Sequence, residues 1–374
     1  MNSICKKKIA IIVNVVPTYR ETFYKKIINN KSYDVTIFAQ KNLPTNLKTI
    51  HYKFKKNLIL CKYFSIGDER LVFTLLPFIK LLKNFDIFVV EGNPRYVSHF
   101  LLATVLLILK KKIVLWIMAH SYNNNQFREK IRLLWSKLFK YLFVYTDREK
   151  LFLEKKGFKK NIIYAMNNGL DQDKIDNIKK KLKSKKIKKK FNHKYFLSCA
   201  RLIKKNKFEI AIKAFAEIKK TNNNFTWYII GEGDQKKDLK NLVYNYDLYE
   251  NVKFLGSIYN EKKLAPYFLM AECLIHPASI GLTLNHAFGY GLPVITHSSK
   301  QFHNPEIAAF KNNSTGLLFI KDNISSLKNA IKKFLYYKNL KQEFSTNCYQ
   351  IVKTKYNINE MVNNFFKIVK KLEI

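Results

Sequence analysis

The sequence predicts an α/β protein built from two doubly wound domains, and three observations lead to this fold class. The chain has 374 residues, more than one hydrophobic core usually serves, so two domains of roughly 150–200 residues each are expected. Its residues are 47% hydrophobic and 14% aromatic, as in a folded globular protein. Short apolar runs alternate with helical patterns in both halves, which is typical of parallel sheets covered by helices.

The expected strands are short runs, mostly rich in β-branched residues. In the first half they lie at residues 9–16, 34–40, 86–92, 112–120, 142–146 and 161–169. In the second half they lie at residues 195–201, 226–233, 252–256, 272–278 and 293–297. Ligands of open α/β sheets bind beyond the carboxyl ends of the strands, so we expect chemistry in the loops that follow these runs.

A lysine-rich segment separates the two predicted domains. Residues 178–194 contain few apolar residues and many lysines. A run of like charges is typical of a solvated surface segment, and such a segment can connect two domains. We therefore expect a first domain over residues 1–177, a basic linker over 178–194 and a second domain over 195–355. Residues 356–374 have the pattern of an amphipathic helix with no strand after it, and we expect this helix to pack back on the first domain.

Two apolar stretches are interpreted as buried elements. The lysine cluster before residues 9–16 resembles the start of a signal peptide, but the run is β-branched, short and ends at Pro17, which favours a strand. Residues 100–109 are followed by three lysines, and this run is shorter than the roughly 20 apolar residues that span a bilayer. The five cysteines have no CxxC spacing, which indicates reduced structural residues of a cytoplasmic protein.

The net charge of +41 is the extreme feature of the composition. Such a charge attracts phosphates on nucleic acid, anionic lipid or substrate, although abundant Asn, Lys, Ile, Phe and Tyr also indicate an A+T-rich genome. The predicted helix over residues 128–143 has Ile131, Leu134, Trp135 and Leu138 on one stripe, so it either lies on anionic lipid or packs on its own sheet. No nucleic-acid module accompanies the charge, so nucleic-acid binding is not expected.

Candidate phosphate-binding groups follow strands of the second domain. In "CARLIKKNKFEI", Arg201 comes directly after a strand, and lysines precede the next helix. A bidentate guanidinium, ammonium groups and a helix start together suit a diphosphate. The next strand ends in "GEG", where Gly231 and Gly233 permit a tight turn and a close approach to a ligand. A third segment, "SIGLTLNHAFGYGLPVIT" (279–296), places Gly281 before a short predicted helix.

In this order and spacing, these segments resemble the C-terminal domain of the GT-B glycosyltransferases, in particular glycosyltransferase family 4. The resemblance runs from "FLSCARLIKKNKFEIAIKAF" to "NNSTGLLF" and continues upstream at "NGLD" (168–171). It implies two Rossmann-like domains facing a central cleft, a nucleotide-sugar donor, and transfer with retention and without a metal ion or other cofactor. "DQD" (171–173) is similar to the metal-binding DxD of another glycosyltransferase fold, but it lies in this turn and is not expected to bind metal.

The resemblance also implies roles for single residues. Arg201 and one lysine would stabilise the departing diphosphate. The family's usual lysine position falls on Asn206, so Lys205 is favoured and Lys207 stays open. His120 follows a first-domain strand where family members carry a histidine, and it would contact the donor sugar; the alternative is a structural core histidine. The expected donor-binding residues are Gly231, Gly233, Gly281, Leu282, Thr283, His286 and Glu306.

One departure concerns a pair of glutamates eight residues apart, of which the second binds the ribose in the family. These positions fall on Ala278 and His286. An imidazole can accept from or donate to a ribose hydroxyl, whereas an alanine cannot replace a carboxylate. A subset of the family carries VGLTxxH here, so the chain resembles a variant. Glu306 matches the acid of the family's PE turn and is expected to hold the loop of the sugar pocket.

The expected function is a metal-independent, retaining hexosyltransferase of bacterial cell-surface polysaccharide synthesis, acting on a UDP- or GDP-linked sugar and a glycan or lipid-linked acceptor. Arg20, Asn93 and Arg95 follow first-domain strands and are expected to meet that acceptor. The location would be the cytoplasm, with peripheral attachment to an anionic membrane surface on the inner face of the plasma membrane. The alternatives are a GT-B-like binding protein that has lost catalysis, suggested by the missing glutamates, and a basic nucleic-acid binder, suggested by charge alone.

Overall fold

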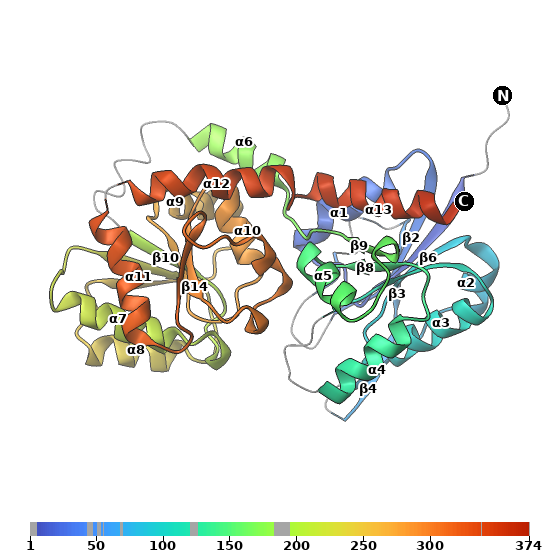
Figure 1. Cartoon of the computed structure of the whole chain (residues 1–374), viewed down its shortest axis with the longest axis horizontal. Coiled ribbons are helices and arrows are strands. Elements are labelled where there is room, and N and C mark those ends of the chain that lie inside the picture. The colour runs from blue at the N-terminus through green and yellow to red at the C-terminus, as the bar shows by residue number, and fades with distance from the viewer. Residues whose placement is uncertain are drawn as a thin grey trace. The chain divides into compact units, whose positions relative to one another are not determined.

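The computed structural model describes residues 6–42, 48–50, 54, 56–67, 70–119, 126–182, 195–337 and 339–373. These residues form two compact units, one of Met1–Asn168 with Ile358–Ile374 and one of Gly169–Asn357. Each unit contains a parallel sheet with helices on its faces (Figure 1). The predicted fold class, two doubly wound α/β domains, is therefore confirmed.

The described part of the first unit contains a sheet of seven parallel strands in the order β3-β2-β1-β6-β7-β8-β9. The chain builds outward from β1 on one side and from β6 on the other, so the topological switch point lies between these two strands. A separate antiparallel hairpin joins β4 (Tyr63–Ile66) and β5 (Leu71–Thr74). The sheet strands are β1 (Lys7–Ile12), β2 (Tyr33–Gln40), β3 (Leu58–Cys61), β6 (Ile87–Glu91), β7 (Lys112–Trp116), β8 (Leu142–Val144) and β9 (Ile163–Ala165).

Two hydrophobic clusters cover the two faces of this sheet, because successive strand residues point to opposite sides. One face packs on α1 (Glu21–Ile28) and α13 (Ile358–Glu373), where Phe365 stacks on Phe143 with ring centroids 5.9 Å apart. The C-terminal helix thus belongs to the first unit (Figure 1). The other face packs on α2 (Phe78–Asn84), α3 (Val97–Ile108), α4 (Gln126–Ser136) and α5 (Asp147–Lys155).

The described part of the second unit contains a six-stranded parallel sheet in the order β12-β11-β10-β13-β14-β15, with its switch point between β10 and β13. The strands are β10 (Tyr195–Cys199), β11 (Thr226–Ile230), β12 (Val252–Gly256), β13 (Leu274–His276), β14 (Val294–His297) and β15 (Gly316–Phe319). Its helices are α6 (Gln172–Leu182), α7 (Phe208–Lys219), α8 (Lys236–Asn245), α9 (Glu261–Met270), α10 (Leu282–Gly289), α11 (Ile324–Tyr336) and α12 (Leu340–Thr354).

Several details differ from the sequence-based expectations. The sequence did not indicate the strands β3, β4, β5 and β15, each of which is only four residues long. The first unit ends at Asn168 and not at residue 177, because α6 packs against α9 and α10 of the second unit. Residues 178–182 of the predicted linker continue α6, and residues 183–194 lie outside the described residues.

The apolar stretch at residues 100–109 is only partly a core helix. Leu102 and Ala103 of α3 are fully buried, but Leu101 and Ile108 are 50% and 72% exposed. No helix in the described part of the chain has the length and apolar character needed to cross a membrane.

Candidate functional site

The loops after β10 and β11 are in close backbone contact at the carboxyl edge of the second sheet, and two glycines make this contact possible. A Cβ on Gly231 would lie 1.9 Å from the carbonyl oxygen of Ala200, and one on Gly233 would lie 2.2 Å from that of Leu202. Leu202 in turn donates its backbone N–H to the carbonyl oxygen of Glu232 at 2.9 Å. Only glycine fits at these two crossings, which explains the "GEG" sequence after the strand.

Arg201 projects from this crossing with an exposed side chain. The turn that follows, η5 (Lys204–Asn206), is pinned because the side-chain amide of Asn206 donates to the carbonyl oxygen of Arg201 at 2.7 Å. Asn206 therefore shapes the loop from the position where the family usually has lysine. Lys205 on the same turn is exposed.

Lys207 differs from Lys205 because it already has a carboxylate partner. Its Nζ lies 2.5 Å from Oδ1 of Asp322, in the loop between β15 and α11. This hydrogen bond holds the pKa of Asp322 below its ordinary value. Of the two lysines that the sequence left open, Lys205 has the side chain better placed to meet a ligand.

The start of α10 lies against the end of β10, so the loops after β10 and β13 meet. Thr283 Oγ1 donates to the carbonyl oxygen of Cys199 at 3.4 Å. Gly281 precedes the helix, and a Cβ there would lie 2.9 Å from the side-chain amide of Asn304. The backbone N–H groups in the first turn of a helix have no intrahelical partner, and they favour an anion. Gly281, Leu282 and Thr283 are each partly exposed.

The loop carrying Glu306 is held to the loop after β13 by the buried side chain of His303. Ile280 donates its N–H to Nδ1 of His303 at 3.2 Å, and Nε2 of His303 donates to the carbonyl oxygen of His297 at 2.9 Å. Burial lowers the pKa of His276 to about 4 and that of His297 to about 3, so both are neutral at ordinary pH. Glu306 is 5% exposed within η7 (Pro305–Ala309), a position suited to supporting the loop.

His286, which the sequence analysis assigned to the donor ribose, has a carboxylate partner in the structure. Its Nε2 lies 2.7 Å from Oε1 of Glu261, in the first turn of α9, and the Tyr290 hydroxyl donates to the same oxygen at 2.5 Å. Burial alone would raise the pKa of Glu261, but these two hydrogen bonds outweigh it and hold that pKa below its ordinary value. Sequence reasoning missed Glu261, although the missing glutamate was a reason to look for a carboxylate elsewhere.

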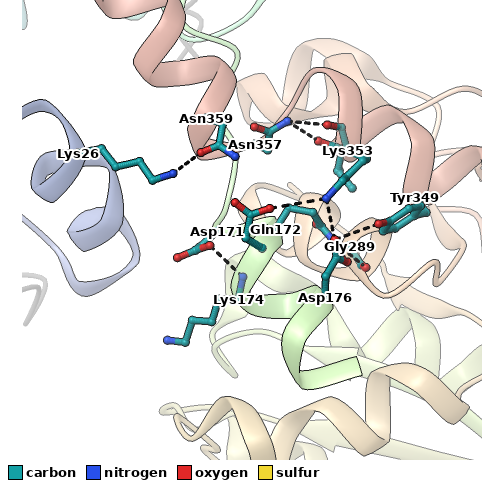
Figure 2. A network of polar contacts seen from close by, with 12 residues as sticks. Lys26, Asp171, Gln172, Lys174, Asp176, Gly289, Tyr349, Lys353, Asn357 and Asn359 are labelled. Carbon is teal, nitrogen blue, oxygen red and sulfur yellow. Dashed lines mark hydrogen bonds and ion pairs between the residues drawn. The ribbon is translucent and has the colours of Figure 1, made fainter. Parts of the chain in front are cut away.

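The end of α10 is tied to α6 by a polar network that Figure 2 shows. Gln172 donates through Nε2 to the carbonyl oxygen of Gly289 at 3.1 Å and to Oδ1 of Asp176 at 2.9 Å (Figure 2). Asp176 also accepts from Tyr349 and Lys353 of α12, each at 2.9 Å (Figure 2). A Cβ on Gly289 would lie 2.8 Å from Gln172 Oε1, so this glycine lets the helix end close to α6.

The "DQD" carboxylates have partners at the start of α6. Asp171 accepts the backbone N–H of Lys174 at 3.0 Å (Figure 2), and Asp173 lies 3.6 Å from Lys353 Nζ. Asp171 therefore accepts from the first turn of α6, whereas Asp173 pairs with a lysine of α12. Among the residues that the structure covers, no group of three or more potential metal ligands is found.

The first-unit candidates are not all brought together. Arg20 is buried, and its guanidinium donates to Asn168 Oδ1 at 2.7 Å and to Met361 Sδ at 3.1 Å. Asn93 and Arg95 are exposed on the loop after β6, where Asn93 Oδ1 accepts the N–H of Arg95 at 3.1 Å. His120 lies outside the described residues.

A cavity of about 90 Å³ lies beside Arg20, at the switch point of the first sheet. Asn93 and Arg95 do not line it. The residues that do are Val13, Asn14, Val15, Pro17, Tyr19, Arg20, Tyr24, Glu91, Trp116 and Tyr145.

The comparisons with known proteins agree with this architecture. Residues 179–351 match the family described as "Glycosyl transferases group 1". An uncharacterized glycosyltransferase of Methanocaldococcus jannaschii is 25% identical over 386 residues, which cover 95% of this chain and 94% of that protein. An alpha-monoglucosyldiacylglycerol synthase of Streptococcus pneumoniae is 28% identical over 114 residues, which cover 30% of this chain and 26% of that protein.

Solved structures resemble the chain over nearly its whole length. A glycosyltransferase of Rickettsia africae has a TM-score of 0.71 at 17% identity, with 98% of each chain covered. The HepE protein of Anabaena, solved in complex with UDP, has a TM-score of 0.72 at 13% identity, with 98% of this chain and 100% of that chain covered. The chain therefore has the GT-B fold, and its residues 179–351 are similar to the glycosyl transferases group 1 family.

Proposed function

We propose that this protein is a metal-independent, retaining hexosyltransferase that takes a sugar from a UDP- or GDP-linked donor. The observation that carries the proposal is the convergence of three features at the switch point of the second sheet: the glycine crossing, the exposed Arg201 and the start of α10. The switch point is where an open α/β sheet binds nucleotides. The UDP complexes of the HepE protein support a nucleotide-sugar donor. Retention and metal independence rest on the resemblance to family 4.

In this proposal the donor diphosphate lies against the start of α10. Its charge increases as the bond to the sugar breaks, and a fixed positive charge lowers the energy of that transition state. Arg201 and Lys205 supply this charge from the loop after β10. His120 contacts the donor sugar, and Glu306 supports the loop beside it.

The ribose of the donor meets a carboxylate that comes from α9. Glu261 takes the place of the glutamate that family 4 carries at position 286, and His286 with Tyr290 holds it by the hydrogen bonds described above. The Glu261 side chain is 25% exposed, so its carboxylate can accept from a hydroxyl group while the hydrogen bond from His286 keeps it ionised. The pair Glu261–His286 thus supplies the acidic group that the family's second glutamate would provide.

The proposed acceptor is a glycan or lipid-linked molecule of bacterial cell-surface polysaccharide synthesis, reached at the cytoplasmic face of the plasma membrane. The names of two similar proteins, a lipopolysaccharide outer core galactosyltransferase and a glucosyldiacylglycerol synthase, support acceptors of this kind.

The surface of the first unit fits attachment to an anionic membrane. Leu134 and Leu138, on and just after α4, are 55% and 61% exposed, and the neighbouring Lys130 and Lys137 are exposed as well. Trp135 packs inward on Phe100, with ring centroids 4.4 Å apart. The helix therefore packs on its own domain and still presents apolar and basic groups to the outside.

Calorimetric titration of the purified protein with UDP-, GDP- and other nucleotide sugars in the presence of EDTA tests the proposal. We expect one nucleotide sugar to bind and to be hydrolysed or transferred. Loss of both binding and turnover in EDTA would overturn metal independence. Binding without any turnover would favour the alternative of a binding protein that has lost catalysis.

A further inference from the structure

The segment that leads into α10 is held by a row of hydrogen bonds around one buried histidine. Ile280, which is fully buried, donates its N–H to Nδ1 of His303 at 3.2 Å. The carbonyl oxygen of Ile280 accepts the N–H of Asn304 at 3.1 Å. Beside it, the Ser279 hydroxyl donates to the carbonyl oxygen of Phe302. His303 is the member of this row whose hydrogen bonds depend on where the proton of an imidazole ring lies.

The two contacts of the His303 ring are compatible with one protonation state. Nδ1 accepts from Ile280 and therefore carries no proton. Nε2 lies 2.9 Å from the carbonyl oxygen of His297 and carries the proton, because a carbonyl oxygen can only accept. The other neutral tautomer and the imidazolium would each place a ring N–H against the N–H of Ile280. Both residues are fully buried, so water does not compensate for the lost hydrogen bond.

The surroundings of His303 favour an uncharged ring. The ring stacks on that of His297, with centroids 3.8 Å apart and planes inclined by 21°. Burial, His303 and Lys321 together lower the pKa of His297 to about 3. The carboxylate nearby, Asp322, already accepts from Lys207 at 2.5 Å and from Lys321 at 3.1 Å. A charge on His303 would therefore be buried next to a stacked neutral ring, with the neighbouring carboxylate already paired.

We propose that His303, held in this single neutral tautomer, positions the start of α10 for an anion. Ile280 is followed directly by Gly281, the residue that caps the N-terminus of α10. A hydrogen bond that fixes the Ile280 N–H also fixes the direction of the next peptide groups, which present their N–H groups at the helix start. His303 acts through this backbone and does not touch the ligand. That the anion is the diphosphate of a nucleotide sugar rests on the proposed function.

Two measurements on the wild-type protein without ligand test the tautomer and its hydrogen bond. In protein labelled with 15N on the rings of its eight histidines, the His303 signals are identified by their loss in His303→Asn. We expect Nε2 of His303 to be protonated and Nδ1 to be unprotonated. The amide proton of Ile280 should exchange slowly with solvent. A charged His303, a proton on its Nδ1 or fast exchange at Ile280 would overturn the proposal.

Two amide substitutions separate the two hydrogen bonds of the ring. His303→Asn puts an amide oxygen near the place of Nδ1, where it can still accept from Ile280. His303→Gln puts an amide nitrogen near the place of Nε2, where it can donate to His297, and leaves Ile280 without its acceptor. We expect His303→Gln to speed up exchange at Ile280 and to weaken binding of pyrophosphate and UDP about tenfold, and His303→Asn to stay within about threefold of wild type. If the histidine only fills space, glutamine is the better replacement because it is nearer in size, and the order of the two variants is reversed.

Asn251 offers a matched control for the loss of a buried hydrogen bond. It is 4% exposed, directly precedes β12 at the amino edge of the same sheet, and donates through Nδ2 to the carbonyl oxygen of Phe225 at 2.9 Å. Asn251→Ala should lower the melting temperature of the protein and leave pyrophosphate and UDP binding unchanged. If thermal unfolding shows that His303→Gln does not fold, His303→Phe takes its place, because it keeps a ring and removes both hydrogen bonds.

The binding results separate this inference from the proposed function. If the protein binds pyrophosphate but neither UDP nor GDP, the proposed function is wrong and the anion site positioned by His303 stands. If UDP or GDP binds and both His303 variants bind it as well as the wild type does, His303 does not position the site and the proposed function stands. If none of the three probes binds, both are wrong.

Discussion

Replacing Glu91 by glutamine should change how the stability of this protein depends on pH. Burial raises the pKa of Glu91 from its ordinary value of 4.5 to about 7 in the folded state. The difference, 7 − 4.5, at about 1.36 kcal/mol per pKa unit, corresponds to about 3 kcal/mol. Because the carboxylate is partly exposed, solvent reduces this value, and we expect roughly 1–3 kcal/mol.

The sign follows from proton binding. The folded state holds the Glu91 proton more tightly than the unfolded state, so this group costs stability as pH rises from about 4.5 to about 7. Glutamine cannot ionise, and its amide oxygen can still accept the Asn14 N–H, which donates to Glu91 Oε2 at 2.8 Å in the wild type. The variant should therefore match the wild type near pH 4 and exceed it by roughly 1–3 kcal/mol at pH 8. His99, whose pKa burial lowers to about 3, titrates in both proteins and cancels in the difference.

Urea unfolding of both proteins between pH 4 and pH 8 measures this difference. Glu250→Gln, at a carboxylate whose side chain is 76% exposed, is the matched control and should show a difference that does not change with pH. A difference for Glu91→Gln that is equally flat would mean that Glu91 ionises normally in the fold. The cavity would then be open to bulk water, and the reasoning about its burial would be refuted.

Three further predictions concern the donor site and the membrane. Arg201→Ala should lower turnover about 10²-fold at saturating donor, the scale of losing one preorganised charge stabiliser, and full activity of this variant would place the diphosphate elsewhere. Glu261→Gln and His286→Ala should each weaken donor binding by about 1–2 kcal/mol, measured by calorimetric titration. The two losses should not add in the double variant, because the two residues act as a pair. Unchanged affinity would mean that the pair only connects α9 to α10. The protein should sediment with anionic vesicles at low salt, and less of it should do so at high salt or after Leu134→Asp and Leu138→Asp. If it binds neither anionic nor neutral vesicles, the high positive charge reflects only amino-acid composition and not membrane attachment.

Much of the fold follows from local features of the sequence. Strand and helix periodicities are properties of a few consecutive residues, so the alternation of apolar runs was sufficient to predict two parallel, doubly wound sheets. The role of the glycines after β11 could also be predicted, because only glycine lets two backbones approach as closely as residues 231 and 200 do. Strands of four residues such as β15 carry too little periodicity to be found in this way.

The partners of single side chains were decided only by tertiary structure. Glu261 and His286 lie on different helices, and no local pattern places their side chains 2.7 Å apart. The end of the first unit depends on the packing of α6 on α9 and α10, which a lysine-rich sequence does not reveal. Likewise, Arg20, Glu91 and Trp116 line one cavity because three distant segments meet at the carboxyl edge of one sheet. Periodicity determines which elements form, whereas the contacts that set burial, charge and pKa join residues far apart in the chain.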